Sequence, residues 1–205
     1  MIYDISYPLH PSIQVYNDKA AKRPTFQTVA DHVTGSVHET DITINLHTGT
    51  HVDYPLHMIA NGDTSDTEDL SLLIGSAKVL DCTNVGDVIT KDHLVSMAIE
   101  EDDFLLFKTK NSFSEHFLFD FTYLSADGAE YLRQKNIRGV GTDGLGIERA
   151  QAEHPTHKTL LSNGIVILEG LRLKDVEAGL YHMICLPLNI VGVEASLARV
   201  ILTDD

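Results

Sequence analysis

The sequence contains no tryptophan and only two cysteines, Cys82 and Cys185, which lie far apart in apolar stretches. Neither belongs to a CxxC pair, so a zinc finger and a thioredoxin-type redox site are excluded. No apolar run reaches the roughly 18 residues that a membrane-spanning helix requires, and the first residues lack the basic and apolar segments of a signal peptide. We therefore expect a cytoplasmic protein in which both cysteines are buried as small hydrophobic side chains.

Basic residues are scarce as well: 15 Lys and Arg stand against 30 Asp and Glu, a formal net charge of −15. Such a chain repels phosphate backbones and anionic membrane surfaces, so neither nucleic acid nor a membrane is an expected partner. Hydrophobic residues make up 43% of the 205 residues, which excludes a disordered chain. At this length we expect a single domain spanning residues 1–205.

Segments rich in β-branched residues alternate with helical patterns along most of the chain. Residues 25–33 and 37–46 flank the turn sequence Thr34-Gly35-Ser36, which predicts a β-hairpin. Further strands are expected at residues 2–6, 77–82, 104–108, 137–142, 165–168, 181–188 and 199–203, and helices at residues 90–99, 125–135 and 155–162. This order indicates an α/β (mixed α+β) fold, with a mixed sheet covered by helices on one side.

Histidine, in contrast, is abundant, with 11 residues, and four candidate ligands fall within the segment HTGTHVDYPLH at residues 47–57. In an extended chain, side chains alternate between two faces with a period of two. His47, His51, Asp53 and His57 all carry odd numbers, so an extended segment would direct them to one face. Gly49 and Pro55 argue against a helix here, and the missing side chain of Gly49 would leave space for an ion.

Two neutral imidazoles and a carboxylate suit zinc, manganese or iron better than calcium, which prefers oxygen ligands alone. His57 lies farther along and could stay free as a general base. Two later residues could complete the site: His157 on the helix after Pro155, and Glu169 at the end of the apolar run 165–168, where a buried carboxylate needs a partner.

The segment 47–57 matches, at every specified position, the HxGTHxDxPxH signature of the putative cyclase family of metal-dependent hydrolases, which includes bacterial kynurenine formamidases. The chain also resembles this family at DISYPL (residues 4–9), at HKTLL (157–161) and at ILE (167–169), and the resemblance covers nearly the whole chain. It implies the family's swivelling β/β/α domain and a homodimer or higher homo-oligomer.

The resemblance also implies roles for single residues. His47, His51 and Asp53 would bind a first metal, and Asp53 would reach a second metal together with His157 and Glu169. His57 would be the proton donor and acceptor. The cofactor would be one or two divalent ions per chain, zinc in the first place and manganese as an alternative. The implied function is hydrolysis of an amide-type bond (formamide, lactam or lactone) in a small molecule by metal-activated water.

Two positions depart from the family pattern. Formamidases of this family place a tryptophan near the N-terminus against their aromatic substrate, and Tyr16 stands at about that position here. Glu148 occupies a position where aspartate is common. We therefore expect Tyr16 to contact the substrate in an altered pocket, with the metal ligands intact.

Two other functions are compatible with the same residues. His51, Asp53 and His157 also form the 2-His-1-carboxylate pattern of non-haem iron oxygenases, but that interpretation leaves Glu169 unused and calls for an all-β jelly roll. A metal-binding protein without catalysis is the second alternative, and a spare base at His57 argues against it.

Overall fold

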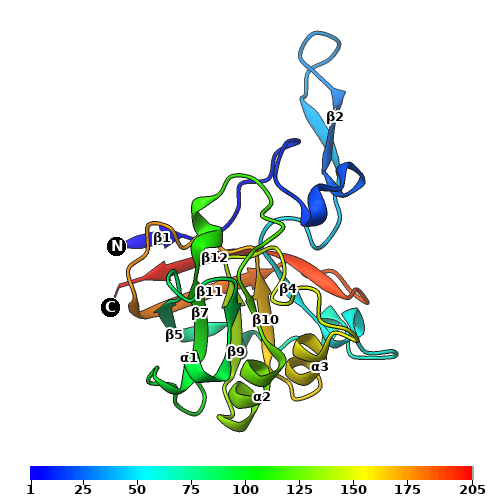
Figure 1. Cartoon of the computed structure of the whole chain (residues 1–205). Coiled ribbons are helices and arrows are strands. Elements are labelled where there is room, and N and C mark those ends of the chain that lie inside the picture. The colour runs from blue at the N-terminus through cyan, green and yellow to red at the C-terminus, as the bar shows by residue number, and fades with distance from the viewer. Residues whose placement is uncertain (205) are drawn as a thin grey trace.

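The structure is a computed structural model, and it describes residues 1–204. One large sheet forms its centre (Figure 1). In spatial order its strands are β1 (Ile2–Asp4), β12 (Ala195–Thr203), β11 (Gly179–Pro187), β5 (Ile74–Asp81), β7 (Phe104–Lys108), β9 (Gly139–Thr142), β10 (Val166–Glu169) and β4 (His51–Asp53). Strand β4 also pairs with β12, so the strands from β12 round to β4 close into a barrel-like ring.

The strands β5, β7, β9 and β10 are mutually parallel, whereas β11, β12 and β4 pair antiparallel to their neighbours. Strand β7 has the sequence FLLFK and is buried on both faces. Phe104 and Leu106 belong to the core inside the ring, and Leu105 and Phe107 belong to the core between the ring and the helices. Continuous apolar runs are typical of such doubly covered parallel strands.

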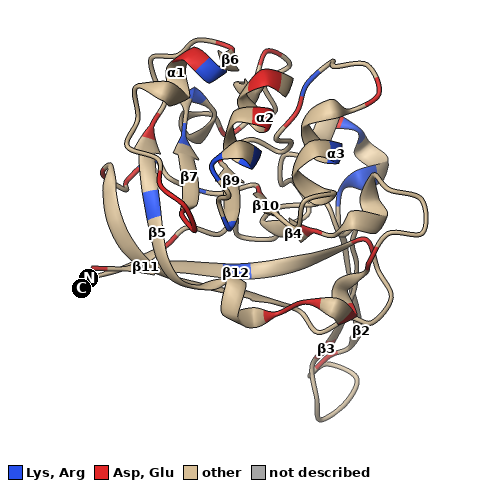
Figure 2. Cartoon of the chain, turned by 90° about the horizontal axis from the view of Figure 1, so that it is seen from below, with Lys and Arg blue, Asp and Glu red and all other residues tan. Residues whose placement is uncertain are grey.

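Three helices cover one side of the sheet: α1 (Lys91–Val95), α2 (Ala126–Gln134) and α3 (Pro155–Leu161), all on the same side in Figure 2. The Ser125 hydroxyl caps α2 by accepting a hydrogen bond from the Gly128 N–H at 3.3 Å. Pro155 occupies the first turn of α3, where its missing N–H costs nothing. The predicted mixed fold with helices on one side is confirmed, although α1 ends earlier than the predicted residue 99.

The predicted hairpin is present as β2 (Thr25–Ala30) and β3 (Glu39–Thr43), with strands shorter than expected. We call residues 25–43 the arm, because in Figure 1 it projects away from the rest of the chain. A second small sheet pairs β6 (Val88–Ile89) with β8 (Tyr123–Leu124). Short 3₁₀ turns occur at Tyr16–Asp18, Ala20–Lys22, Pro55–His57, Ser65–Thr67, Leu70–Leu72 and Lys110–Phe113. Among residues 1–204, no helix has the length and apolar character needed to cross a membrane.

The prediction of one extended strand over residues 47–57 is wrong. Only His51–Asp53 is a strand, and Pro55–His57 is a 3₁₀ turn. Gly49 has φ +74°, and a Cβ there would lie 3.0 Å from a Leu9 methyl carbon. Gly49 therefore allows the chain to turn against Leu9, and does not make space for an ion.

Candidate metal centre

Strand β4 supplies the central two residues of the candidate site. Alternation along the strand places His51 and Asp53 on one face, while Val52 between them packs into the core inside the ring. The antiparallel pairing with β10 sets Glu169 opposite His51. The short strand thus brings three potential ligands together, two from itself and one from its neighbour.

His47 reaches the cluster through the Gly49 turn. Its Nδ1 atom lies 3.1 Å from Oδ1 of Asp53 and 3.2 Å from Nε2 of His51, and the last two atoms are 3.4 Å apart. Ligand atoms about 2.0 Å from a tetrahedral zinc ion lie roughly 3.3 Å from one another. These three atoms therefore have the spacing of one metal's ligands, and we call them the first ligand set.

A second ligand set shares Asp53 with the first. Helix α3 places Nε2 of His157 at 3.9 Å from the other Asp53 oxygen, Oδ2, and at 3.4 Å from Oε1 of Glu169. The second Glu169 oxygen lies 3.5 Å from Nε2 of His51. Asp53 therefore directs one oxygen toward each set, as a bridging carboxylate would.

The two Asp53 oxygens test whether a cation fits. Both are buried, and within residues 1–204 neither accepts a hydrogen bond of acceptable geometry. A buried carboxylate without hydrogen bonds is costly, and a divalent ion between the two ligand sets would engage both oxygens. The nitrogen and oxygen donors suit zinc or manganese. The residues present therefore fit a divalent transition metal.

Two contacts outside the ligand sets fix the imidazole rings. The Nδ1–H of His51 donates to the Gly49 carbonyl oxygen at 2.9 Å, and Nδ1 of His157 lies 2.7 Å from Oε2 of Glu148. With a proton held on each Nδ1, each Nε2 atom is directed into the cluster and is the atom that a metal would bind. Glu148 is the functional residue that the sequence interpretation missed, since it was noted only as a departure from the family pattern.

The charges in the cluster bear on how a cation would enter it. Burial alone would lower the pKa of His51 and His157, but the carboxylates beside each ring outweigh burial and raise the pKa to about 10. A metal must displace the protons held on Nε2 before it can bind there. Its affinity must therefore fall as the pH falls.

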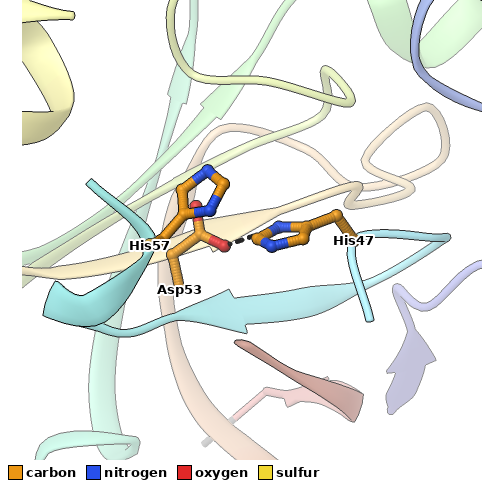
Figure 3. Close-up of side chains that lie close together, drawn as sticks. All are labelled: His47, Asp53 and His57. Carbon is orange, nitrogen blue, oxygen red and sulfur yellow. Dashed lines mark ion pairs between the residues drawn. The ribbon is translucent and has the colours of Figure 1, made fainter. Parts of the chain in front are cut away.

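His57 lies beside the two ligand sets. Its ring centroid is 4.1 Å from that of His47 and 5.8 Å from that of His157. Figure 3 shows the side chains of His47, Asp53 and His57 close together, with the ion pair between Asp53 and His47. Burial lowers the pKa of His57, which favours the neutral imidazole that can accept a proton.

A cavity of about 190 Å³ opens next to these groups and is lined by His47, His57, His157 and Glu169. Tyr16 lines it too, with its ring edge-to-face against Phe117 at 5.4 Å and Phe121 at 6.2 Å between centroids. The structure therefore brings together all seven residues that the sequence nominated: Tyr16, His47, His51, Asp53, His57, His157 and Glu169.

The structure also has a larger groove, and an exposed histidine lies at the rim of the small cavity. A larger groove of about 550 Å³ runs along Leu9 and Leu197, but its charged residues, Asp4 and Arg199, already form an ion pair. His154 lines the rim of the small cavity as an exposed residue with φ +53°. The buried titratable groups therefore gather at the smaller cavity.

The model of the family described as "Putative cyclase" matches residues 3–149. The kynurenine formamidase of Salinibacter ruber is 31% identical, over 99% of this chain and 97% of its own length. A solved structure described as a predicted metal-dependent hydrolase from Bacillus stearothermophilus has 50% identity and a TM-score of 0.91, covering 98% of this chain and 97% of its own. Isatin hydrolase A from Labrenzia aggregata has 25% identity and a TM-score of 0.83, covering 98% and 93%.

These matches bear on the oxygenase alternative, which called for an all-β jelly roll. The structure instead has a parallel sheet centre and three covering helices among its described residues, and its solved neighbours are hydrolases. The signature at residues 47–57 lies within the matched range. The chain belongs to the Putative cyclase family of metal-dependent hydrolases.

Proposed function

We propose that this enzyme hydrolyses an amide-type bond of a small aryl compound, such as a formamide, a lactam or a lactone, in the cavity beside the two ligand sets. The observation that carries the proposal is the Asp53 carboxylate, which directs one oxygen toward each set, with neither oxygen accepting a hydrogen bond within residues 1–204. Relatives named kynurenine formamidase and a neighbour named isatin hydrolase support a non-peptide amide as the target.

We further propose that one or two divalent ions, zinc first and manganese second, are held by His47, His51 and Asp53 and by Asp53, His157 and Glu169. A divalent ion at this position supplies Lewis acidity and lowers the pKa of water toward neutrality. The buried nitrogen and oxygen donors and their spacing support this assignment.

His57 is proposed as the residue that moves the proton. It faces the cavity, and neither ligand set needs it. Its imidazole accepts a proton from water as the water oxygen attacks the carbonyl carbon, and it returns that proton to the leaving nitrogen as the C–N bond breaks. A formamide gives formic acid and an amine, and a lactam gives one ring-opened amino acid. A lactone gives a hydroxy acid, with the proton returned to the leaving oxygen. The Tyr16 ring offers a flat apolar wall against which an aryl group can pack.

The first test measures bound metal and turnover in parallel. The wild-type protein should contain one to two equivalents of zinc or manganese by plasma mass spectrometry and hydrolyse formanilide or isatin. His57→Ala should keep its metal and lose about 10²–10⁴-fold in kcat, whereas His51→Ala should lose metal. His10→Ala, at an exposed histidine outside the cavity, is the control.

Four results would contradict the proposal. Metal loss in His57→Ala would make His57 a ligand, and a wild-type protein without metal after reconstitution would remove the centre itself. Bound iron with oxygen consumption would favour the oxygenase, and a fully loaded protein without turnover on amides and lactones would favour a non-catalytic metal-binding protein.

We also propose that this single domain forms a homodimer in the cytoplasm. The arm is a two-stranded hairpin, which is marginally stable alone in water, and it exposes Phe26, Val29 and Ile42. A second copy that covers these side chains would remove an unfavourable apolar surface. The free, buried thiols of Cys82 and Cys185 suit a reducing compartment.

A further inference from the structure

The cavity wall contains one lysine, Lys22, among several histidines and carboxylates. The two carboxylates there, Glu148 and Glu169, are already engaged: each lies within 3.4 Å of a His157 nitrogen, Glu148 accepts two backbone N–H groups and Glu169 accepts one. Among the described residues that line the cavity, Lys22 is the only Lys or Arg, in a chain with a net charge of −15.

Lys22 is held in place by the loop that carries the first ligand set. Its carbonyl oxygen accepts a hydrogen bond from the hydroxyl of buried Thr48 at 3.0 Å, and Thr48 directly follows His47. The Lys22 ammonium lies 5.4 Å from the centroid of the Tyr16 ring. The residue is half-buried and lines the cavity, so its ammonium lies beside both the Tyr16 ring and the cavity.

The ammonium has no ionic partner within residues 1–204, where no carboxylate oxygen lies within 4.0 Å of it. Its neighbour Arg23 shows the contrast, because Arg23 forms an ion pair with Asp18 at 2.6 Å. A half-buried cation without a carboxylate partner is available to an anionic group on a bound molecule.

We propose that Lys22 determines substrate specificity by binding a carboxylate of the substrate, with the substrate's aryl ring against Tyr16. This inference rests on the proposed function and narrows it to anionic aryl amides, as opposed to neutral ones. A neutral lactam would leave the ammonium unpaired. An ion pair partly shielded from water by the cavity wall is stronger than one on the open surface.

The test compares formanilide with 2-, 3- and 4-formamidobenzoate, which add a carboxylate at different positions of the same ring. Wild-type enzyme should prefer at least one formamidobenzoate. Lys22→Met should raise KM for that isomer by about tenfold more than it raises KM for formanilide, with the ratio of the two kcat values kept. Lys22→Arg should keep most of the preference. Lys19→Met, which removes an exposed lysine three residues away, should behave like wild type.

The inference is overturned if Lys22→Met affects formanilide and the formamidobenzoates equally, or if neither changes. If wild-type enzyme hydrolyses none of the four compounds, the proposed formamide hydrolysis is what fails. Calorimetric titration of the metal-loaded protein with the three aminobenzoates and with aniline then tests Lys22 without turnover. At least one aminobenzoate should bind about tenfold more weakly to Lys22→Met than to wild type, with aniline unchanged, and equal binding would refute the role.

Discussion

At the scale of single residues, the site depends on groups that never touch a substrate. Glu148 accepts from both the backbone N–H and the ring of His157 at the start of α3. This contact keeps the His157 ring in one orientation and leaves Nε2 directed at Asp53 and Glu169. The position of the second ligand set therefore depends on a carboxylate outside it.

We expect Glu148→Gln to weaken metal binding by about tenfold or more, because the neutral amide makes His157 a poorer ligand. Competition with a chelating dye at fixed pH measures the affinity. Glu153→Gln is the matched control, since Glu153 lies in the same segment and is almost fully exposed. Equal affinities in Glu148→Gln and wild type would show that the carboxylate is not needed for binding.

The ligand residues themselves could be found in the sequence, because their types and spacing are specific for metals. Glu148 could not be singled out in this way. Its role depends on a hydrogen bond to His157, nine positions away, and that bond exists only once α3 and the preceding loop have folded. A glutamate that ends the sequence GLGIE is also compatible with a simple surface position.

At the scale of elements, two backbones meet at the end of β10. Gly170 follows Glu169 with φ +68°, and a Cβ there would lie 2.3 Å from the Gly49 carbonyl oxygen. The Gly170 carbonyl oxygen accepts a hydrogen bond of 2.5 Å from the Thr50 hydroxyl. The turn before β4 and the end of β10 are therefore held together by close approach of the two backbones and by the Thr50 hydroxyl, and this contact keeps Glu169 close to His51.

Gly170→Ala should destabilise the protein by about 3 kcal/mol or more, from a left-handed backbone and a backbone clash together. Gly164→Ala isolates the first contribution, because Gly164 has φ +69° with nothing within 4 Å of its would-be Cβ. Gly164→Ala should therefore lower the free energy of unfolding by only about 1–2 kcal/mol. Urea unfolding of both variants gives the difference, and equal losses would mean that the close approach to Gly49 is unimportant.

Sequence patterns predicted most elements correctly and the path of residues 47–57 incorrectly. The apolar run of β7 and the Ser125 cap are local signals, so their predicted positions hold. The alternation rule assumed that the chain stays extended. The chain turns at Gly49 before β4 and at Pro55 after it, and His47 and His57 reach the cluster through these turns. The ring closure by β12 joins residues more than 140 positions apart, which no local pattern indicates.

At the scale of the whole molecule, the arm projects away from the rest of the fold (Figure 1), and nearly all residues of its two strands are exposed. Phe26 and Ile42 lie directly opposite each other on β2 and β3 and share one face of the hairpin. Gln27 and Asp41 form the next pair and face the other way. The apolar face is the one that a second copy would cover.

If that face mediates dimerisation, Phe26→Lys and Ile42→Lys should convert a dimer into a monomer, because a lysine is costly to bury in an apolar interface. Light scattering after size-exclusion chromatography measures the mass of each variant. Gln27→Lys, on the opposite face and across from Asp41, should remain dimeric. A wild-type protein that is monomeric at micromolar concentration would refute the dimer.

The pairing of β4 also delays the completion of the site during synthesis of the chain. Its two edges pair with β10 and β12. During synthesis, β4 can therefore pair on both edges only after residues 166–169 and 195–197 have been made. During synthesis, His51 and Asp53 leave the ribosome long before the strands that will flank them. With chain growth of about 5–20 residues per second, roughly 6–28 seconds separate the synthesis of Asp53 from that of the residues that pair with β4. The site therefore cannot be complete until β12, the last strand of the chain, has been made.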